Sequence, residues 1–261
     1  MNYNRIWGLV IRHLYNFRHN LDRLFDGFYW PAIDIIIWGL TFQYVENTNV
    51  GISNVLLLML SGLIFWQVVW RGQYEMTVNF LEEIWNKNLV NLFSSPLTVN
   101  EWMSGLVILS IMKMIVTISF SIFLAWLLYA INVFSFGFLI IPFIVLLLMM
   151  GWWVGLFVAG MLSYLGQNLQ IFAWAGVFIL FPFSAIYYPV STLPAWAQVI
   201  ARMTPSSYIF EGMREVVLQG NFNYINLVIS FGLNLLYLVL SIFFFKFMFK
   251  KSKEKGLARL E

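Results

Sequence analysis

The chain has no cysteine and few charged side chains among its 261 residues. The lack of cysteine excludes disulfide bonds, thiolate metal sites and cysteine nucleophiles. Charged residues account for 10% of the chain, against about 25% in a typical soluble domain, whereas hydrophobic residues account for 61%. Together with a mean hydropathy of +0.79, this composition is that of an integral membrane protein.

The sequence also lacks the motifs of several catalytic sites. It has no phosphate loop of the form GxxxxGK followed by Ser or Thr, so the chain cannot by itself hold ATP in such a loop. The two histidines, His13 and His19, lack HExxH spacing, and we expect them to face lipid headgroups rather than a metal. A lipid transferase using Asp34 or Glu211 would need paired carboxylates at one depth, which are missing. We therefore expect no enzyme activity, no cofactor, no metal and no nucleic-acid partner.

Long apolar runs predict an all-α membrane protein with six transmembrane helices. A span needs about 20 apolar residues, because a helix rises 1.5 Å per residue. The predicted spans are residues 27–46, 52–70, 103–131, 137–163, 169–188 and 225–247. Residues 1–26 are predicted to form an N-terminal amphipathic helix on the cytoplasmic membrane surface, and residues 27–261 one membrane domain.

Basic residues orient the chain. They gather in the N-terminal segment, in the loop after the second span and in the tail: Arg5, Arg12, Arg18, Arg23, Arg71, Lys87, Lys246, Lys250, Lys251, Lys253, Lys255 and Arg259. The loops near Asn47 and Asn132 carry none. The positive-inside rule then predicts a multi-pass protein of the cytoplasmic (inner) membrane with both termini in the cytoplasm.

Residues 187–220, YYPVSTLPAWAQVIARMTPSSYIFEGMREVVLQG, form an unusual stretch before the last apolar run. Its prolines and charges exclude an ordinary span, since each charge at mid-bilayer would cost about 2.5 to 3.5 kcal/mol. Apolar residues recur at helical spacing on both sides of Pro205, which predicts two short amphipathic helices at the membrane surface. Glu211, Arg214 and Glu215 have the spacing of a local ion pair.

This layout resembles the outer re-entrant hairpin of the ABC-2 type exporter permeases. The pattern FP…LP.W…P..Y..EG.R..L.G is matched by Phe181, Pro182, Leu193, Pro194, Trp196, Pro205, Tyr208, Glu211, Gly212, Arg214, Leu218 and Gly220. The resemblance implies that residues 189–224 form an outer gate at a dimer interface. Its implied gate residues are Pro194, Trp196, Pro205, Tyr208, Glu211, Gly212 and Arg214. A surface lid that does not gate is the alternative.

The segment 75–101 is the largest cytoplasmic element predicted, with an apolar helical face opposite a polar one. The spacing of Thr98 and Glu101 predicts a capping box at the start of the third span. In the resembling family this loop carries the coupling helix that docks on an ATPase subunit. The implied contact residues are Glu82, Glu83, Trp85, Asn86 and Lys87. The alternative is an interfacial helix that only covers the membrane surface.

Two ionisable residues stand inside predicted spans. Asp34 lies about 9 Å from the cytoplasmic end of the first span, and Lys113 lies in the third. Because charges inside a membrane usually pair or face a polar cavity, we hypothesise that these two pair across the spans. Independent snorkelling toward the interface is the alternative, and it suits Lys113 better than the shorter Asp34.

Aromatic residues make up 19% of the chain, many of them tryptophans in or beside spans. Interfacial belts account for many of them. An aromatic lining for an amphiphilic or carbohydrate substrate is a further possibility, because aromatic faces bind apolar surfaces. In the fourth span, Gly151, Gly155 and Ala159 follow a small-xxx-small pattern that permits close helix packing.

The resemblance implies that this chain is the membrane subunit of an exporter that works by alternating access. The implied assembly contains two permeases, either a homodimer or close homologues, and two separate ATPase subunits. Membrane lipids are expected to contact the permeases. Such families export drugs, lipids, lipo-oligosaccharides or undecaprenyl-linked polysaccharides, and the sequence does not choose among these amphiphilic, lipid-linked or drug-like cargoes. A non-transporting assembly factor on the same plan stays open. So does a self-sufficient secondary transporter or channel, although the sparse intramembrane charge and the lack of inverted repeats disfavour it.

Overall fold

The computed structural model describes residues 1–48 and 54–260, and these form helices without any strand. The all-α prediction is confirmed. The α-helices are α1 (Tyr3–His19), α2 (Leu21–Thr48), α3 (Val55–Trp85), α4 (Leu89–Ser94), α5 (Val99–Tyr129), α6 (Ile140–Leu165), α7 (Ile171–Ala175), α8 (Ala195–Met203), α9 (Pro205–Gln219) and α10 (Tyr224–Glu254). Short 3₁₀ turns join them: η1 (Val133–Leu139), η2 (Gly166–Leu169), η3 (Gly176–Ile179), η4 (Phe181–Phe183), η5 (Val190–Thr192) and η6 (Leu257–Leu260).

Within the described residues, four helical stretches are long and apolar enough to cross a membrane. They are Val55–Trp85, Val99–Tyr129, Val133–Leu169 and Tyr224–Glu254, which contain most of four predicted spans. The predicted first span lies within α2, a helix of 28 residues with Pro31 inside it. Asp34 and several Trp and Tyr residues lower its hydropathy, so α2 does not belong to the four.

The predicted fifth span, residues 169–188, is not one continuous helix, so the expectation of an unbroken helix there was wrong. The chain there is broken into η2, α7, η3 and η4. Side chains of α3 bond the irregular backbone: Gln73 Nε2 and Thr77 Oγ1 both donate to the Ala173 carbonyl at 2.7 Å, and Val177 N donates to Gln73 Oε1 at 2.7 Å. A buried broken helix needs such partners, because an unpaired backbone group is costly there.

The second predicted span is longer than expected. The apolar run ends near residue 70, but α3 continues for 15 residues beyond it to Trp85. Buried polar side chains fill this continuation, so hydropathy alone could not reveal it. Residues 75–85 of the predicted cytoplasmic segment thus belong to α3, and residues 86–98, which join α3 to α5, are called the tip. The capping box of Thr98 and Glu101 at the start of α5 is confirmed.

Close helix packing holds α3 in the centre of the bundle. A methyl group on Gly151 of α6 would lie 2.8 Å from the Gly72 Cα, and one on Gly155 would lie 2.6 Å from the Met76 Cβ. Ala159 is also buried. Because only small residues allow the two backbones to approach this closely, the small-xxx-small stripe serves helix packing within one chain.

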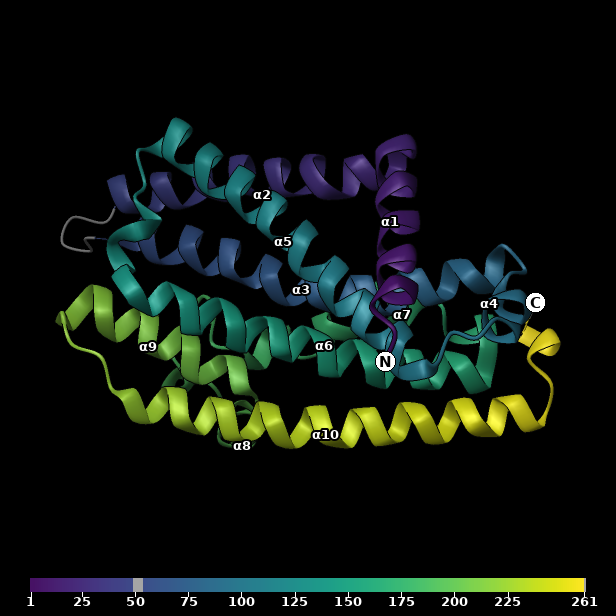
Figure 1. Ribbon diagram of the computed structural model, residues 1–261. Coiled ribbons are helices and arrows are strands. Elements are labelled where there is room, and N and C mark those ends of the chain that lie inside the picture. Colours follow the sequence, from purple (N-terminus) through teal and green to yellow (C-terminus); the bar gives the residue numbers. More distant parts are fainter. Residues whose placement is uncertain (49–53, 261) are drawn as a thin grey trace.

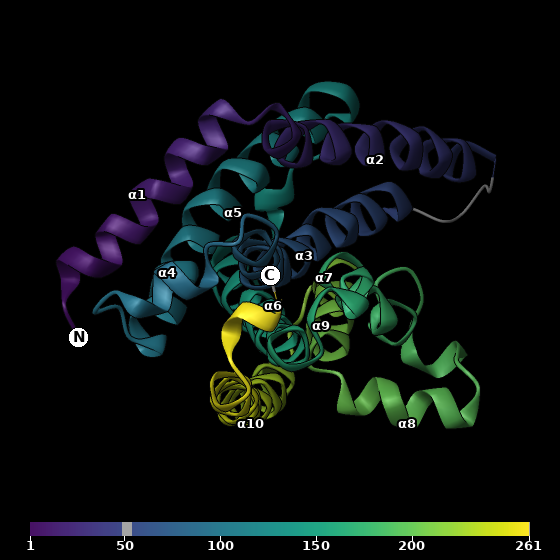
Figure 2. The same ribbon diagram turned by 90° about the vertical axis from the view of Figure 1, so that its right-hand side faces the viewer.

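Figure 1 shows α3, α6 and α10 running along the molecule, with α2 and α5 packed on α3. We call the end that carries α1, α4 and both chain termini the α1 end, and the opposite end the α9 end. Helix α1 lies across the α1 end rather than along the bundle. In Figure 2, where α10 is seen end-on, α8 extends sideways away from the bundle.

The N-terminal amphipathic helix is shorter than predicted, and a different face of it packs against the bundle. It ends at His19, where Asn20 separates it from α2. Ile6 and Val10 of this helix are buried, as an amphipathic helix requires of its apolar face, whereas Tyr3 is 83% exposed. His13, expected to face headgroups, is instead buried against α3, since the tertiary packing places this face of α1 inward.

Candidate functional site

A cavity of about 610 Å³ lies between α2, α3 and the broken segment that follows α6. Its walls are formed by Asp26, Trp30, Pro31, Asp34, Trp38, Leu63, Trp66, Gln67, Trp70, Trp174, Ala175, Phe178, Phe181 and Tyr187. More than half of these residues are aromatic. The volume falls in the range of about 300 to 1,000 Å³ that small-molecule sites occupy.

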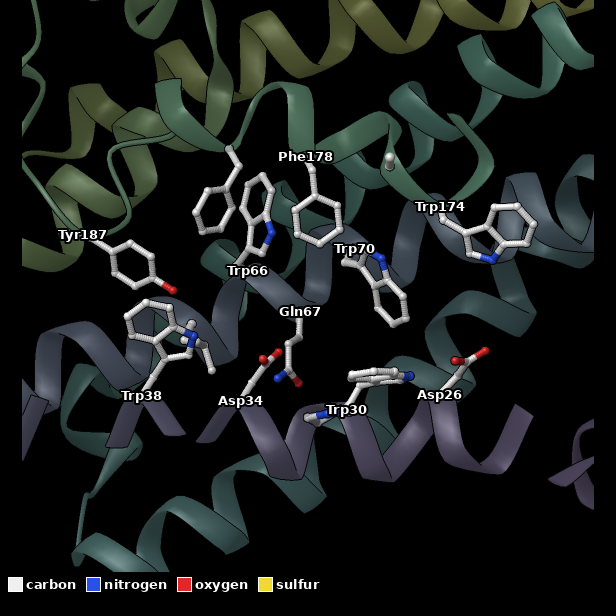
Figure 3. Close-up of a pocket in the computed structure, with 14 residues that line it drawn as sticks. Asp26, Trp30, Asp34, Trp38, Trp66, Gln67, Trp70, Trp174, Phe178 and Tyr187 are labelled. Atoms are coloured by element: carbon white, nitrogen blue, oxygen red, sulfur yellow. The ribbon is translucent and has the colours of Figure 1, made fainter. Parts of the chain in front are cut away.

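Ring contacts between distant segments hold the wall of the cavity toward the α9 end. The Trp66 and Phe181 rings meet edge to face with centroids 5.0 Å apart, and Tyr187 stacks on Trp38 at 5.9 Å. At the rim, Trp30 is 55% exposed and Phe178 is 48% exposed. The cavity is therefore lined by packed rings on one side, with the half-exposed rings of Trp30 and Phe178 at its rim, and Figure 3 shows these rings around it.

Helix α2 contributes a regular face to this cavity. Asp26, Trp30, Asp34 and Trp38 follow one another at intervals of four residues and all line it. Because residues four apart share a helix face, carboxylates and indoles alternate at a rise of about 6 Å. Figure 3 shows the four side chains along this one helix, with Gln67 of α3 beside Asp34.

The two carboxylates differ in their surroundings. Asp26 accepts a hydrogen bond from the Tyr74 hydroxyl, and its carbonyl accepts one from Arg71 Nη2 at 3.0 Å. Asp34, in contrast, forms no ion pair with any residue that the structure describes. Gln67 is held by the Ser121 hydroxyl, which donates to Gln67 Oε1 at 2.9 Å. Its amide nitrogen is buried and has no partner among the described residues.

The hypothesis that Asp34 pairs with Lys113 was wrong. Lys113 Nζ instead donates to Glu75 Oε2 at 2.8 Å, and Glu75 is fully buried. Glu75 also lies 3.5 Å from Arg71 Nη1 and accepts from Asn79 Nδ2 at 2.8 Å. Sequence reasoning missed Glu75 because it placed that residue in a cytoplasmic loop. The spacing of four between Arg71, Glu75 and Asn79 was the available signal.

Glu82 and Glu83, which are among the residues predicted to contact an ATPase, bind basic residues of this chain. Arg23 Nε of α2 donates to Glu82 Oε1 at 2.9 Å, and Arg12 of α1 donates to Glu83. The side chain of Glu83 is only 6% exposed. These two acids therefore attach α1 and α2 to the end of α3, because a buried carboxylate needs a basic partner.

The other three residues of that group face outward. Asn86 and Lys87 are exposed at the tip, and Trp85 is 42% exposed. Trp85 also stacks on Trp174 with ring centroids 5.7 Å apart. Since Trp174 lines the cavity, one stacked pair joins the end of α3, next to the tip, to the cavity wall.

In the predicted hairpin, residues 189–224, two helices form as expected, α8 and α9. Pro194 caps α8 and Pro205 begins α9. The predicted ion pair is present, with Arg214 Nη1 3.0 Å from Glu211 Oε2. Glu215 does not join this pair and accepts from Asn223 N at 3.3 Å.

The Glu211 and Arg214 pair also fixes the chain beside the cavity. Glu211 Oε1 accepts from Val190 N at 2.5 Å, and Arg214 Nη2 donates to the Ala185 carbonyl at 3.0 Å. Tyr187, which lines the cavity, lies between these two anchored positions. The hairpin and the cavity are thus one connected structure.

The remaining hairpin residues have structural partners or face outward. The Tyr208 hydroxyl donates to the Arg202 carbonyl at 2.8 Å, and a methyl group on Gly212 would lie 2.5 Å from the Phe222 ring. Trp196 on α8 is 65% exposed. Helix α8 therefore presents an apolar side chain to its surroundings rather than to the bundle.

A family model described as ABC-2 type transporter matches residues 8–218. The chain belongs to the ABC-2 type transporter family. The matched region begins in α1, includes the cavity and the charge cluster around Glu75, and ends in α9. A comparison with curated proteins finds no match. Family membership makes this chain a multi-pass membrane subunit of an ABC transporter, without an ATPase motif of its own, and implies association with an ABC ATPase.

Proposed function

We propose that this ABC-2 protein is the permease of an exporter that moves an amphiphilic or drug-like substrate out of the cytoplasm. The observation that carries the proposal is the aromatic cavity beside α2. A polysaccharide would need a continuous aromatic pathway across the membrane, whereas a molecule taken from the bilayer needs a lateral opening. The half-exposed rings at the rim of this cavity favour the second kind of substrate.

The proposal includes six spans, with α2 as the first and the broken segment 166–188 as the fifth. A broken helix is tolerated at membrane depth where it is bonded by protein or lines a cavity, and this segment meets both conditions. Both termini lie at the α1 end, where most of the basic residues also gather. The positive-inside rule places this end in the cytoplasm of the cell.

In the working assembly, two ATPase subunits dock on the tips of two permeases. Asn86 and Lys87 are exposed there, and a polar hollow of about 530 Å³ separates the tip from α1. Closure of the ATPases would push on the tip. The push reaches the cavity directly along α3, which carries Trp66 and Trp70, and laterally through the stack of Trp85 on Trp174.

The outer gate lies at the α9 end in this proposal. The Glu211 and Arg214 pair holds the chain around Tyr187, so a movement of the hairpin would move one wall of the cavity. The exposed apolar face of α8, which includes Trp196, would meet the second permease or lipid. A surface lid that does not gate would lack the bonds of Glu211 and Arg214 that join the hairpin to the cavity wall.

The experiment is native purification in mild detergent followed by mass spectrometry of bound proteins. We expect a stoichiometric P-loop ATPase that is lost with Lys87→Glu at the tip. Lys250→Glu is the matched control, because Lys250 is an exposed lysine near the same end of the molecule but outside the tip. Retention of the ATPase by the Lys87 variant, or its loss from both variants, would contradict docking at the tip. Absence of any ATPase in several detergents would contradict the exporter assignment.

A further inference from the structure

The charged residues that line the cavity are acidic. Asp26 and Asp34 are its charged lining residues, and none of the described residues that line it is basic. Tyr74 already engages the carboxylate of Asp26. The carboxylate of Asp34 is half-buried, and no basic residue of the described chain pairs with it. A carboxylate in such apolar surroundings attracts a positive charge strongly, because little water screens it.

The aromatic walls favour the same sign of charge. The faces of tryptophan rings carry negative potential and bind cations better than those of other side chains. Figure 3 shows Asp34 with Trp30 and Trp38 on either side of it along α2, and Trp66 and Trp70 on α3 opposite. An anion in this position would meet both the carboxylate and the negative ring faces. The alternation along α2 repeats the same pair of features at Asp26 and Trp30.

Gln67 adds a neutral donor beside Asp34. The residue is 7% exposed, and its side-chain oxygen accepts a hydrogen bond from Ser121. Its amide nitrogen is buried and has no partner among the described residues. An unsatisfied buried donor is uncommon and calls for an explanation. This nitrogen has almost no exposed surface, so a ligand in the cavity would reach it only after the side chain turns.

We propose that the cavity binds lipophilic organic cations and that Asp34 is the residue that selects them. This inference rests on the proposed function, since it names the class of substrate for the same cavity. A fitting ligand has a protonated amine or another onium centre within a largely apolar body. The onium centre lies at Asp34 and the apolar groups lie against the indoles. Lipid-linked anions are excluded by the same features.

The test compares two probes of nearly equal shape and opposite charge, tetraphenylphosphonium and tetraphenylborate. Binding is measured by equilibrium dialysis against the purified permease in detergent and in nanodiscs, with empty nanodiscs as the blank. We expect saturable binding of the phosphonium and none of the borate. Asp34→Asn should weaken phosphonium binding about tenfold to a hundredfold, the effect of losing the partly screened Coulomb attraction of one carboxylate for a cation without a hydrogen-bond donor. Asp34→Glu, which keeps the charge, should retain most of it.

Glu254→Gln is the matched control, because Glu254 is an exposed carboxylate that does not line the cavity. It should change binding less than threefold. Equal losses in both variants would assign the effect to the net charge of the protein and overturn the role of Asp34. Wild-type protein that fails to bind the phosphonium, or binds both probes alike, would overturn the cation inference.

The folding of each variant is checked by thermal unfolding. Removal of an unpaired carboxylate should leave the melting temperature of Asp34→Asn unchanged or higher, so a loss of binding is then a loss of the site. Because dialysis uses the permease without ATP, its outcome is separate from that of the ATPase experiment. A bound ATPase without phosphonium binding would overturn the cation inference alone. Phosphonium binding without an ATPase would overturn only the exporter assignment.

Discussion

Glu75 should be the side chain on which the buried charge cluster depends most. The cluster joins Glu75 to Lys113 at 2.8 Å and to Arg71 at 3.5 Å, and all three side chains are almost completely buried. Glu75→Gln keeps the shape but leaves two buried cations without a carboxylate. Breaking a buried pair in this way costs about 3 to 5 kcal/mol. Lys113→Met leaves Glu75 paired with Arg71, so we expect a loss of only about 1 to 3 kcal/mol, that of a charged hydrogen bond.

The assay is reversible unfolding of the purified protein in mixed micelles, followed by tryptophan fluorescence, for the single and double variants. The two substitutions should couple by more than 1 kcal/mol, because Glu75 and Lys113 are in contact. Asp34→Asn and Lys113→Met should instead be additive within about 0.5 kcal/mol, since the structure does not pair them. The reasoning would be refuted if Lys113→Met were as destabilising as Glu75→Gln, or if Asp34 rather than Glu75 coupled to Lys113.

Three other predictions concern coupling, packing and pH. Trp85→Ala removes the stack on Trp174, so in proteoliposomes ATP hydrolysis should continue while transport falls, with an unchanged melting temperature; unchanged coupling would remove this stack from the pathway. Gly151→Ala should lower the free energy of unfolding by about 1 to 3 kcal/mol, because the added methyl group would overpack the contact with α3. Gly232→Ala, whose methyl group meets open space, should leave it unchanged. Equal melting temperatures for the two variants would contradict this packing. Burial, and then the charge of a neighbouring arginine, lower the pKa of His13 from 6.5 to about 3, so the unfolded chain binds a proton first on acidification. Stability should therefore fall below pH 6.5 by up to about 1.4 kcal/mol per pH unit, and His13→Gln should abolish that part of the slope in unfolding titrations; an unchanged slope would show that other groups produce it.

The cavity shows how far a sequence pattern can lead. The series Asp26, Trp30, Asp34 and Trp38 was visible as a spacing of four, which on a helix predicts a shared face. The choice of partner for that face was not visible. It depends on α3 and on a segment more than 100 residues away that closes the other side through Trp174 and Tyr187. The aromatic lining considered from composition is thus present, at a position that only packing could assign.

Local interactions were determined by the sequence itself. The membrane class follows from composition, because apolar area must leave water. The capping box of Thr98 with Glu101 and the pair of Glu211 with Arg214 each join residues three apart, so the geometry of one helical turn fixes them. The helices on either side of Pro205 follow from the same short-range rules.

Only the tertiary structure decided the long-range partners. Lys113 bonds Glu75 across 38 residues, and Glu83 binds Arg12 across 71, so no local periodicity could select either partner. The continuation of α3 past its apolar run became possible because those partners satisfy its buried charges. The break in the predicted fifth span likewise depends on Gln73, which bonds Ala173 across 100 residues. A buried polar group takes whatever partner the packed helices bring to it, and that packing is a property of the whole chain.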